Sequence, residues 1–375
     1  MSGLVVAAAG GGASLGTAGY DRAKEVREFD ESKIGVKGLV DGGLASIPRF
    51  FHHPSSSLNL PPPAAGASIP VVDLSLPHHR AVELTSAAAR DWGFFQITNH
   101  GVPSAAISAA LSAVQAFNEL PTEAKAAYYT RNQSGGVSFN TNFDLFRSNA
   151  ATWRDTLQIT MGPSPVDPSR IPEVCRRDLL AWDGYSLAVA SKLFALLSEG
   201  LGAAPARLEE LSCLKGRQMV CHYYPYCPQP HLTLGLAGHT DPGVLTVLIQ
   251  NEVPGLQVRK ASAGEAGGGD AWVEVDPIPG AIIVNVGDTL QMISNDEYRS
   301  VEHKVVANPS EKGRVSVGTF YNPGQRDGSS RYGPLQELIS LARPARYREF
   351  TMPEFMGVFF SKELGSKSLL DHFRS

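Results

Sequence analysis

Residues 244–250 read Val-Leu-Thr-Val-Leu-Ile-Gln, a short apolar and β-branched run that follows directly after Pro-Gly. Short runs of this composition, bounded by Gly, Pro, Asn and Asp, are typical of β-strands. Beyond Lys215-Gly216 the chain contains eight of them: Gln218–Tyr224, Val244–Gln250, Leu256–Arg259, Trp272–Val275, Ala281–Val286, Thr289–Ile293, Val301–Ala307 and Val315–Tyr321. Eight closely spaced short strands predict a β-sandwich or barrel in this part of the chain.

The chain before Lys215 has a different pattern. Helical spacing predicts helices over Tyr20–Val40, Ala81–Trp92, Pro103–Ala116 and Pro172–Leu201, with short strands near residues 69–74 and 94–97. A polar loop studded with aromatic residues is expected at 132–149, and a flexible hairpin tip at 261–269. The fold class is therefore mainly β with flanking α. We expect a disordered tail at 1–19, a mostly helical N-terminal region at 20–215, a β-rich core at 216–323 and a C-terminal helical segment at 324–375 that closes the functional site.

Composition narrows the class of protein. The net charge is −4 and no run of Lys or Arg occurs, so no nucleic-acid or membrane-surface partner is expected. Four cysteines without a C-x-x-C pair indicate free thiols in a reducing compartment, and we expect a cytoplasmic protein. No stretch of about 18 consecutive apolar residues predicts a membrane span.

The sequence Gly238-His-Thr-Asp-Pro242 carries the first candidate site. His239 and Asp241 are one residue apart, so an extended strand directs both side chains to the same face. His303 lies on a later predicted strand that can fold back beside them. Two imidazoles and one carboxylate that leave positions open suit non-haem Fe(II) chemistry with oxygen. The alternative is that this spacing is a chance occurrence among ten histidines. His100, beside a Gly turn, is expected to bind backbone groups instead of metal.

A second candidate site follows from strand parity. Arg314 and Ser316 share one face of a predicted strand, together with Phe320, and His222 and Tyr224 share one face of another. A guanidinium can bind a carboxylate through two parallel hydrogen bonds, and a hydroxyl two residues away can reach the same group. The alternative for Arg314 alone is a surface ion pair. Combined with the metal ligands, the pattern indicates an iron site with a dicarboxylate anchored beside it.

These motifs resemble those of the plant soluble 2-oxoglutarate/Fe(II)-dependent dioxygenases. The resemblance covers nearly everything after the tail and rests on Trp92-Gly-Phe-Phe-Gln-Ile-Thr-Asn-His-Gly-Val-Pro103, His222-Tyr-Tyr-Pro-Tyr-Cys-Pro-Gln-Pro230, Gly238-His-Thr-Asp241, Val301-Glu-His303 and Arg314-Val-Ser316. The head of the chain and Trp153-Arg-Asp-Thr156 are similar to the branch of 1-aminocyclopropane-1-carboxylate oxidase homologues, which includes benzoxazinoid-glucoside dioxygenases.

The resemblance implies a double-stranded β-helix (jelly-roll) core, with helical segments before and after it in the sequence. It implies Fe(II) on His239, Asp241 and His303, and 2-oxoglutarate on Arg314, Ser316 and Tyr224. Many members carry Asn at the position of His222, so its role near the co-substrate stays open. Ascorbate is the expected reductant, and Phe320 is expected to lie against the substrate.

The expected reaction is hydroxylation of a small plant specialised metabolite by a monomeric enzyme, with O2 consumed and succinate and CO2 released. The substrate is expected to be aromatic, indole-derived or a glucosylated benzoxazinoid-like compound, in a pocket that includes Phe320, Phe143 and Phe146. Two alternatives remain: an ethylene-forming oxidase that consumes ascorbate, and a catalytically silent jelly-roll that binds a small ligand. Fold analogy does not choose among hydroxylation, demethylation, desaturation and ring closure.

Overall fold

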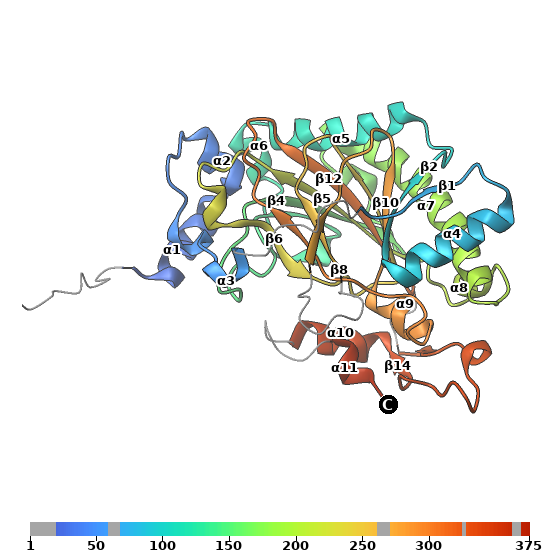
Figure 1. The fold of residues 1–375 in the computed structure, drawn as a ribbon. Helices are drawn as coiled ribbons and strands as arrows, with labels where there is room; N and C mark the ends of the chain where they lie inside the picture. The colour runs from blue at the N-terminus through green and yellow to red at the C-terminus, as the bar shows by residue number, and fades with distance from the viewer. Residues whose placement is uncertain (1–19, 59–67, 261–270, 325–327, 362–368) are drawn as a thin grey trace, which may run out of the picture.

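Two β-sheets face each other at the centre of the molecule (Figure 1). The computed structural model describes residues 20–58, 68–260, 271–324, 328–361 and 369–375, so the predicted tail at 1–19 and the hairpin tip at 261–269 lie outside the described residues. The larger sheet has eight described strands, in the order β1 (Val71–Asp73), β2 (Phe94–Thr98), β10 (Ile282–Val286), β7 (Leu245–Gln250), β12 (Arg314–Asn322), β5 (Gly216–Tyr224), β4 (Asp155–Gly162) and β3 (Val137–Asn140).

The smaller sheet has four described strands, in the order β6 (Leu234–His239), β11 (His303–Val306), β8 (Leu256–Lys260) and β9 (Ala271–Glu274). Its pairs are antiparallel, as are all described pairs of the larger sheet except the parallel pair β1–β2. Apolar side chains of both sheets fill the space between them, including Leu256, Val258, Ile283 and Val305. The predicted double-stranded β-helix core is confirmed.

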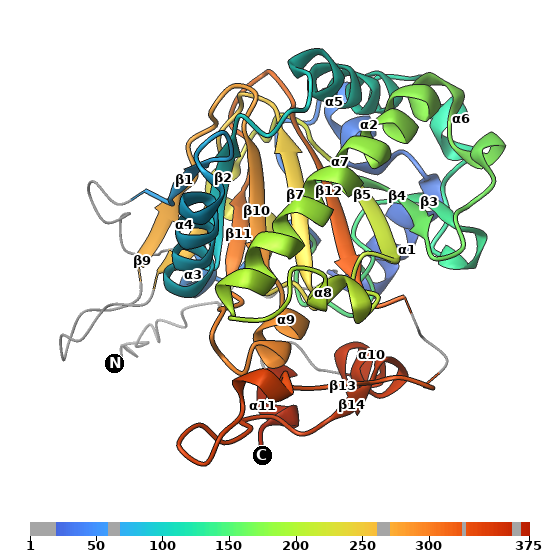
Figure 2. The same ribbon diagram turned by 90° about the vertical axis from the view of Figure 1, so that its right-hand side faces the viewer.

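Long helices cover the outer face of the larger sheet (Figure 2). These are α4 (His78–Asp91), α5 (Ser104–Asn118) and α7 (Glu173–Gly200). Alternate residues of the central strands, such as Ile159, Met219 and Val317, pack under them in the main hydrophobic core. By length and composition alone α7 could cross a membrane. Its residues Leu193, Phe194 and Leu197 are buried in this core instead, as expected of a backing helix.

Shorter helices complete the described chain: α1 (Arg22–Ser32), α2 (Gly35–Asp41), α3 (Ser55–Leu58), α6 (Thr122–Ala126), α8 (Arg207–Glu210), α9 (Asp288–Ile293), α10 (Met352–Ser361) and α11 (Leu369–Phe373), with 3-10 turns at Arg49–Phe51, Gln133–Gly135, Pro168–Arg170, Pro230–Leu232 and Gln336–Leu338. The single helix predicted over Tyr20–Val40 is wrong, because Lys33 is left-handed (φ 55°) and separates α1 from α2. The buried Asp155 carboxylate accepts the backbone N–H groups of Val36 and Lys37 and so caps α2.

The strand predicted at Thr289–Ile293 is also wrong, because this segment is helix α9. Its first N–H groups donate to the loop after β6: Asp288 to the carbonyl of Asp241 at 2.7 Å, and Thr289 to that of Gly243 at 3.0 Å. A short, fully buried apolar run fits a strand or a buried helix equally well by sequence pattern. Conversely, β6 is absent from the eight predicted strands, because Leu-Gly-Leu-Ala-Gly-His lacks the β-branched residues typical of strands. The extended strand expected to carry both His239 and Asp241 ends at His239, so Asp241 lies in the loop after it.

The C-terminal segment lies at one end of the sheets, next to α9, in both views (Figures 1 and 2). It contains β13 (Arg331–Tyr332), β14 (Phe350–Thr351), α10 and α11. Part of the loop predicted at 132–149 is instead the buried strand β3. Strands β1 to β4 all precede residue 215 but belong to the larger sheet. The predicted boundary at 215/216 therefore separates two regions of the sequence without separating the sheets. All four cysteines are buried and unpaired, as predicted.

Candidate metal and co-substrate site

Two strands of the smaller sheet bring the two candidate histidines together. His239 is the last residue of β6, and the antiparallel register places it directly opposite His303, the first residue of β11. The two imidazole rings have their centroids 4.3 Å apart. Each Nδ1 faces a backbone carbonyl, at 2.9 Å for His239 (Ala237) and 3.3 Å for His303 (Val301). These contacts favour the tautomer with Nδ1–H, which leaves both Nε2 lone pairs directed to the centre of the site.

Asp241 completes the cluster from the loop after β6. Its Oδ1 lies 3.6 Å from Nε2 of His239 and 3.7 Å from Nε2 of His303. Its Oδ2 accepts hydrogen bonds from the Thr246 hydroxyl at 2.6 Å and from the Asn285 side-chain amide at 2.7 Å. One carboxylate oxygen is therefore held by β7 and β10, while the other remains free to bind a cation.

The cluster is enclosed on one side and open on another. The side chain of Asp241 is 3% exposed and that of His303 is 10% exposed, whereas that of His239 is 35% exposed. The Phe94 ring packs against His303 with centroids 5.0 Å apart and covers the enclosed side. Access to the site is therefore from the side of His239.

The charges of the three groups depend on one another. Burial acts to raise the pKa of Asp241, but the neighbouring histidines and the amide of Asn285 outweigh it and hold that pKa far below its usual value. Burial and the charge of His239 lower the pKa of His303 to about 4. Burial acts to lower the pKa of His239, but the hydrogen bond and charge of Asp241 raise it overall. Near neutral pH the cluster thus contains a carboxylate and a neutral His303.

The donor set fits a divalent transition metal. The candidate ligand atoms all lie within 4.8 Å of one another. Atoms bound to one first-row metal at about 2.1 Å lie roughly 3–4 Å apart, and Oδ1 of Asp241 lies at such distances from the Nε2 atoms of His239 (3.6 Å) and His303 (3.7 Å). Two imidazoles and one carboxylate on one face, with the remaining positions open, is the arrangement of non-haem Fe(II) oxygenases.

Deeper between the sheets, β5 and β12 form the second predicted cluster. Arg314 lies opposite Tyr224, and Ser316 lies opposite His222. The Arg314 guanidinium lies 4.9 Å from the centroid of the Tyr224 ring, and its residue is 1% exposed. Its Nε and Nη1 are buried without a hydrogen-bond partner, and burial lowers the pKa of this guanidinium. A buried guanidinium with free N–H groups fits a carboxylate ligand, because a carboxylate supplies both charge and acceptors.

His222 lies between this cluster and the metal ligands. Its Nδ1 is 3.0 Å from the hydroxyl of Thr156 on β4, which lies opposite it in the sheet. Burial and the charges of Arg154 and Arg314 hold the pKa of His222 well below its ordinary value. His222 is therefore a neutral imidazole that offers one hydrogen-bonding nitrogen to the cavity.

A single narrow cavity of about 50 Å³ connects both clusters. Its walls include every predicted metal and co-substrate residue and also Phe320, and they consist of Phe94, Val220, His222, Tyr224, Leu236, His239, Asp241, Thr246, Leu248, Leu256, Ile283, Asn285, His303, Val305, Arg314, Ser316, Gly318 and Phe320. Phe143 and Phe146 are not among them. They are 49% and 52% exposed, and Phe146 packs against the guanidinium of Arg131. The structure does not bring these two side chains into the cavity.

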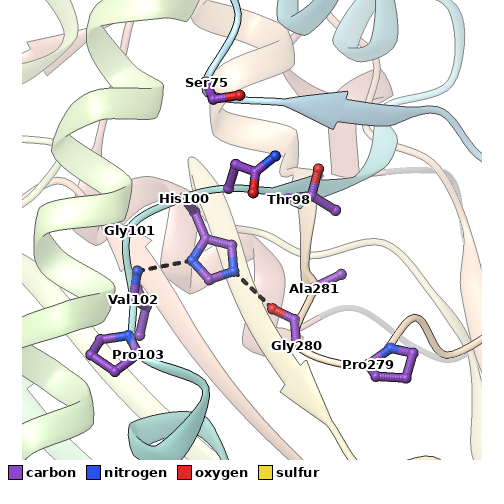
Figure 3. Close-up of a pocket in the computed structure, with 10 residues that line it drawn as sticks. Ser75, Thr98, His100, Gly101, Val102, Pro103, Pro279, Gly280 and Ala281 are labelled. Carbon is purple, nitrogen blue, oxygen red and sulfur yellow. Dashed lines mark hydrogen bonds between the residues drawn. The ribbon is translucent and has the colours of Figure 1, made fainter.

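A larger groove of about 660 Å³ lies away from this site and contains His100 (Figure 3). The Nδ1 of His100 accepts from the backbone N–H of Val102 at 3.1 Å, and its Nε2 is 2.8 Å from the carbonyl of Gly280. Both ring nitrogens are thus bound to backbone groups, as predicted.

The sequence did not reveal the residues whose hydrogen bonds hold the site residues in place. Thr246 and Asn285 hold Asp241, Thr156 holds His222, and Gln250 accepts from the guanidinium of Arg314 at 2.6 Å. Asn285 had a usable signal, because it is a lone polar residue in the apolar strand Ile-Ile-Val-Asn-Val. Thr246, Thr156 and Gln250 are ordinary polar residues on strands. Their contacts become evident only when the strand order and register are known.

A jelly-roll that holds two imidazoles and a carboxylate beside a buried guanidinium defines a non-haem iron oxygenase. Comparison with known proteins identifies the family. The family model of the 2OG-Fe(II) oxygenase superfamily matches residues 215–323, and that of the non-haem dioxygenase in morphine synthesis N-terminal region matches residues 69–177. The chain belongs to the 2OG-Fe(II) oxygenase superfamily. It is an oxidoreductase that uses Fe(II) and 2-oxoglutarate, and ascorbate is typical of such enzymes.

Individual relatives agree with this assignment. The 1-aminocyclopropane-1-carboxylate oxidase homolog 3 of Arabidopsis thaliana is 41% identical, covering 95% of this chain and 97% of the relative, and homolog 2 is 40% identical with the same coverage. The crystal structure of JOX2 in complex with 2OG, Fe and JA superimposes with a TM-score of 0.79, 31% identity, and coverage of 91% of this chain and 97% of that one. The predicted resemblance to the oxidase-homologue branch is confirmed.

Proposed function

We propose that this enzyme hydroxylates a small plant specialised metabolite while it converts 2-oxoglutarate and O2 to succinate and CO2. The observation that carries the proposal is one cavity with the candidate iron ligands at one end and, at the other, a buried guanidinium whose Nε and Nη1 have no hydrogen-bond partner. This arrangement orients a 2-oxo acid that has a second carboxylate, and such orientation is the protein's main contribution to the reaction.

In this proposal His239, Asp241 and His303 hold Fe(II), which supplies oxygen activation when bound. Arg314 and Ser316 bind the distal carboxylate of 2-oxoglutarate, and the Tyr224 ring supports the guanidinium from one side. His222 directs its free nitrogen to the co-substrate, because Thr156 holds its other nitrogen. The enclosed side behind Phe94 keeps water from the metal ligands, so the open side near His239 is left for the substrate.

The substrate we propose is aromatic, indole-derived or a glucosylated benzoxazinoid-like compound. Phe320 offers an aromatic surface and stands between Gln218 on β5 and Thr246 on β7. The cavity wall also carries the uncharged polar side chains of Thr246, Asn285 and Ser316. An aromatic face next to neutral polar groups suits a ring that carries hydroxyl or sugar substituents. Phe143 and Phe146 belong to a surface loop whose Arg147 donates to the carbonyl of Phe360 in α10 at 3.2 Å, and their part in substrate binding remains a proposal.

We also propose that the enzyme is a cytoplasmic monomer without nucleic-acid or membrane partners. The support is the net charge of −4, the absence of a Lys/Arg run and four buried unpaired cysteines.

The test is succinate release from 2-oxoglutarate by purified protein with Fe(II) and ascorbate. Wild type, His239→Ala and Arg314→Ala are compared, alone and with a panel of plant phenolics, indoles and benzoxazinoid glucosides. We expect turnover in wild type, faster turnover with a true substrate, and loss in both variants. Ethylene formation from 1-aminocyclopropane-1-carboxylate with ascorbate and without 2-oxoglutarate would favour the oxidase alternative. Bound iron without any turnover of 2-oxoglutarate would favour the silent binder.

A further inference from the structure

The environment of the Arg314 guanidinium contains one contact that the proposed chemistry does not use. Nη2 donates to Oε1 of Gln250 at 2.6 Å. Gln250 is the last residue of β7 and lies opposite Ser316 in the register of β7 and β12. Among the described residues, no carboxylate forms an ion pair with Arg314, so this amide oxygen is its side-chain hydrogen-bond acceptor there.

The orientation of the Gln250 amide follows from chemistry. A guanidinium only donates hydrogen bonds, so the oxygen of Gln250 must face Arg314 and the nitrogen must point away. The Nε2 of Gln250 is buried and has no partner. A buried N–H without a partner is energetically unfavourable. Gln250 therefore keeps its contact with Arg314 although its own Nε2 stays unpaired.

The remainder of Arg314 is confined by its neighbours. The Tyr224 ring lies 4.9 Å from the guanidinium carbon. On another side, a Cβ added at Gly255 would lie 3.7 Å from Cδ of Arg314, so the backbone approaches the stem of the side chain closely. Gln250 fixes Nη2, and the buried atoms Nε and Nη1 are left without partners. The head group is thus held with its free N–H groups presented to a ligand.

We infer that Gln250 is a positioning residue that orients Arg314 and thereby sets the preference of the enzyme for a 2-oxo acid with a second carboxylate. The inference rests on the proposed role of Arg314 as the anchor of the distal carboxylate. Gln250 does not line the cavity and acts through Arg314.

The test measures binding instead of turnover. Isothermal titration calorimetry on the full chain loaded with Mn(II), without oxygen, gives the affinity for 2-oxoglutarate and for 2-oxopentanoate, which lacks the distal carboxylate. The variants are Gln250→Met, which keeps the side-chain volume but removes the acceptor, and Gln250→Glu, whose carboxylate would pair with Arg314. Gln257→Met is the matched control, because Gln257 lies on β8 and makes no side-chain hydrogen bond among the described residues.

We expect Gln250→Met to weaken 2-oxoglutarate binding about tenfold, or about 1.4 kcal/mol, and to leave 2-oxopentanoate binding within about twofold. Gln250→Glu should weaken 2-oxoglutarate binding further, because its carboxylate competes for the same cation. Gln257→Met should behave as wild type.

Three results would overturn the inference. In the first, Gln250→Met retains the wild-type preference between the two acids. In the second, both acids lose affinity equally, which would assign Gln250 to the general stability of the cavity. In the third, wild type shows no preference, which would also remove the proposed role of Arg314 and so differs from failure of Gln250 alone.

Discussion

Replacing Thr246 by Val should weaken iron binding although Thr246 is not a candidate ligand. The substitution keeps the shape of the side chain and removes the hydroxyl that donates to Oδ2 of Asp241 at 2.6 Å. Asp241 is 2% exposed, so water cannot readily replace the lost donor. The carboxylate would then be held by Asn285 alone.

The magnitude follows from the charge of the acceptor. A hydrogen bond to an ionised group contributes about 1.5–3 kcal/mol. Residues that orient metal ligands in this way typically change metal affinity about 10–100-fold, which is about 1.4–2.7 kcal/mol. We therefore expect Thr246→Val to raise the Fe(II) dissociation constant by at least about tenfold.

The assay is competition for Fe(II) against a chromophoric chelator in the absence of oxygen. Thr319→Val is a matched control, because the Thr319 hydroxyl is buried without a hydrogen-bond partner on β12, the strand beside β7. This control should bind Fe(II) as wild type does and should be at least as stable. If Thr246→Val binds Fe(II) within twofold of wild type, the hydrogen bond does not orient the ligand and the reasoning fails.

Three further predictions concern stability and co-substrate binding. Gly35→Ala should destabilise the fold by roughly 3 kcal/mol in urea denaturation, because φ is +68° and a Cβ would lie 2.7 Å from the Asp155 carboxylate oxygens. Gly43→Ala, at φ +73° with nothing within 4 Å, should cost only about 1 kcal/mol. Burial acts to raise the pKa of Asp296, but its hydrogen bonds to the C-terminal segment outweigh it and lower that pKa. The stabilisation that the Asp296 carboxylate provides is therefore complete above about pH 4 and is lost as the pH falls through the lowered pKa. In thermal melts, Asp296→Asn should be less stable than wild type at neutral pH and should not show this loss of stability at acid pH. In steady-state kinetics, His222→Leu should raise the KM for 2-oxoglutarate about tenfold while His222→Asn stays near wild type, because an amide can replace the imidazole donor.

Strand parity was the part of the sequence that predicted the site best. Because side chains alternate along a strand, Arg314, Ser316 and Phe320 had to share a face, and the structure places all three on the cavity wall. The same reasoning placed His222 beside Tyr224. The reasoning from strand parity succeeded because the opposite faces of β5 and β12 pack under helices, so the direction of each side chain follows from its position in the strand.

The sequence could not supply register or loop position. Thr156 and Gln250 matter only because β4 and β7 lie one strand away from His222 and Arg314, and nothing local in the sequence specifies which strands become neighbours. For Phe143 and Phe146 the missing information is the position of their loop. Aromatic residues in a polar loop suggested a pocket wall, but the loop packs through Leu145, and the two Phe side chains lie on the surface.

Helix α9 connects the metal site to the C-terminal segment, and its prediction as a strand hid that connection. At its start, the N–H of Asp288 donates to the carbonyl of Asp241, so the helix holds the backbone of a candidate iron ligand. Just beyond its end, Asp296 is left-handed (φ 66°), and its carboxylate accepts from Arg346 at 3.2 Å and Arg374 at 3.0 Å in the C-terminal segment. If this segment were a strand, it would have no helix N-terminus whose N–H groups could donate to the loop after β6. The metal ligand is thus held at the start of α9 and the C-terminal segment by the turn that follows α9, so a change that loosens one of these contacts should be felt at the other.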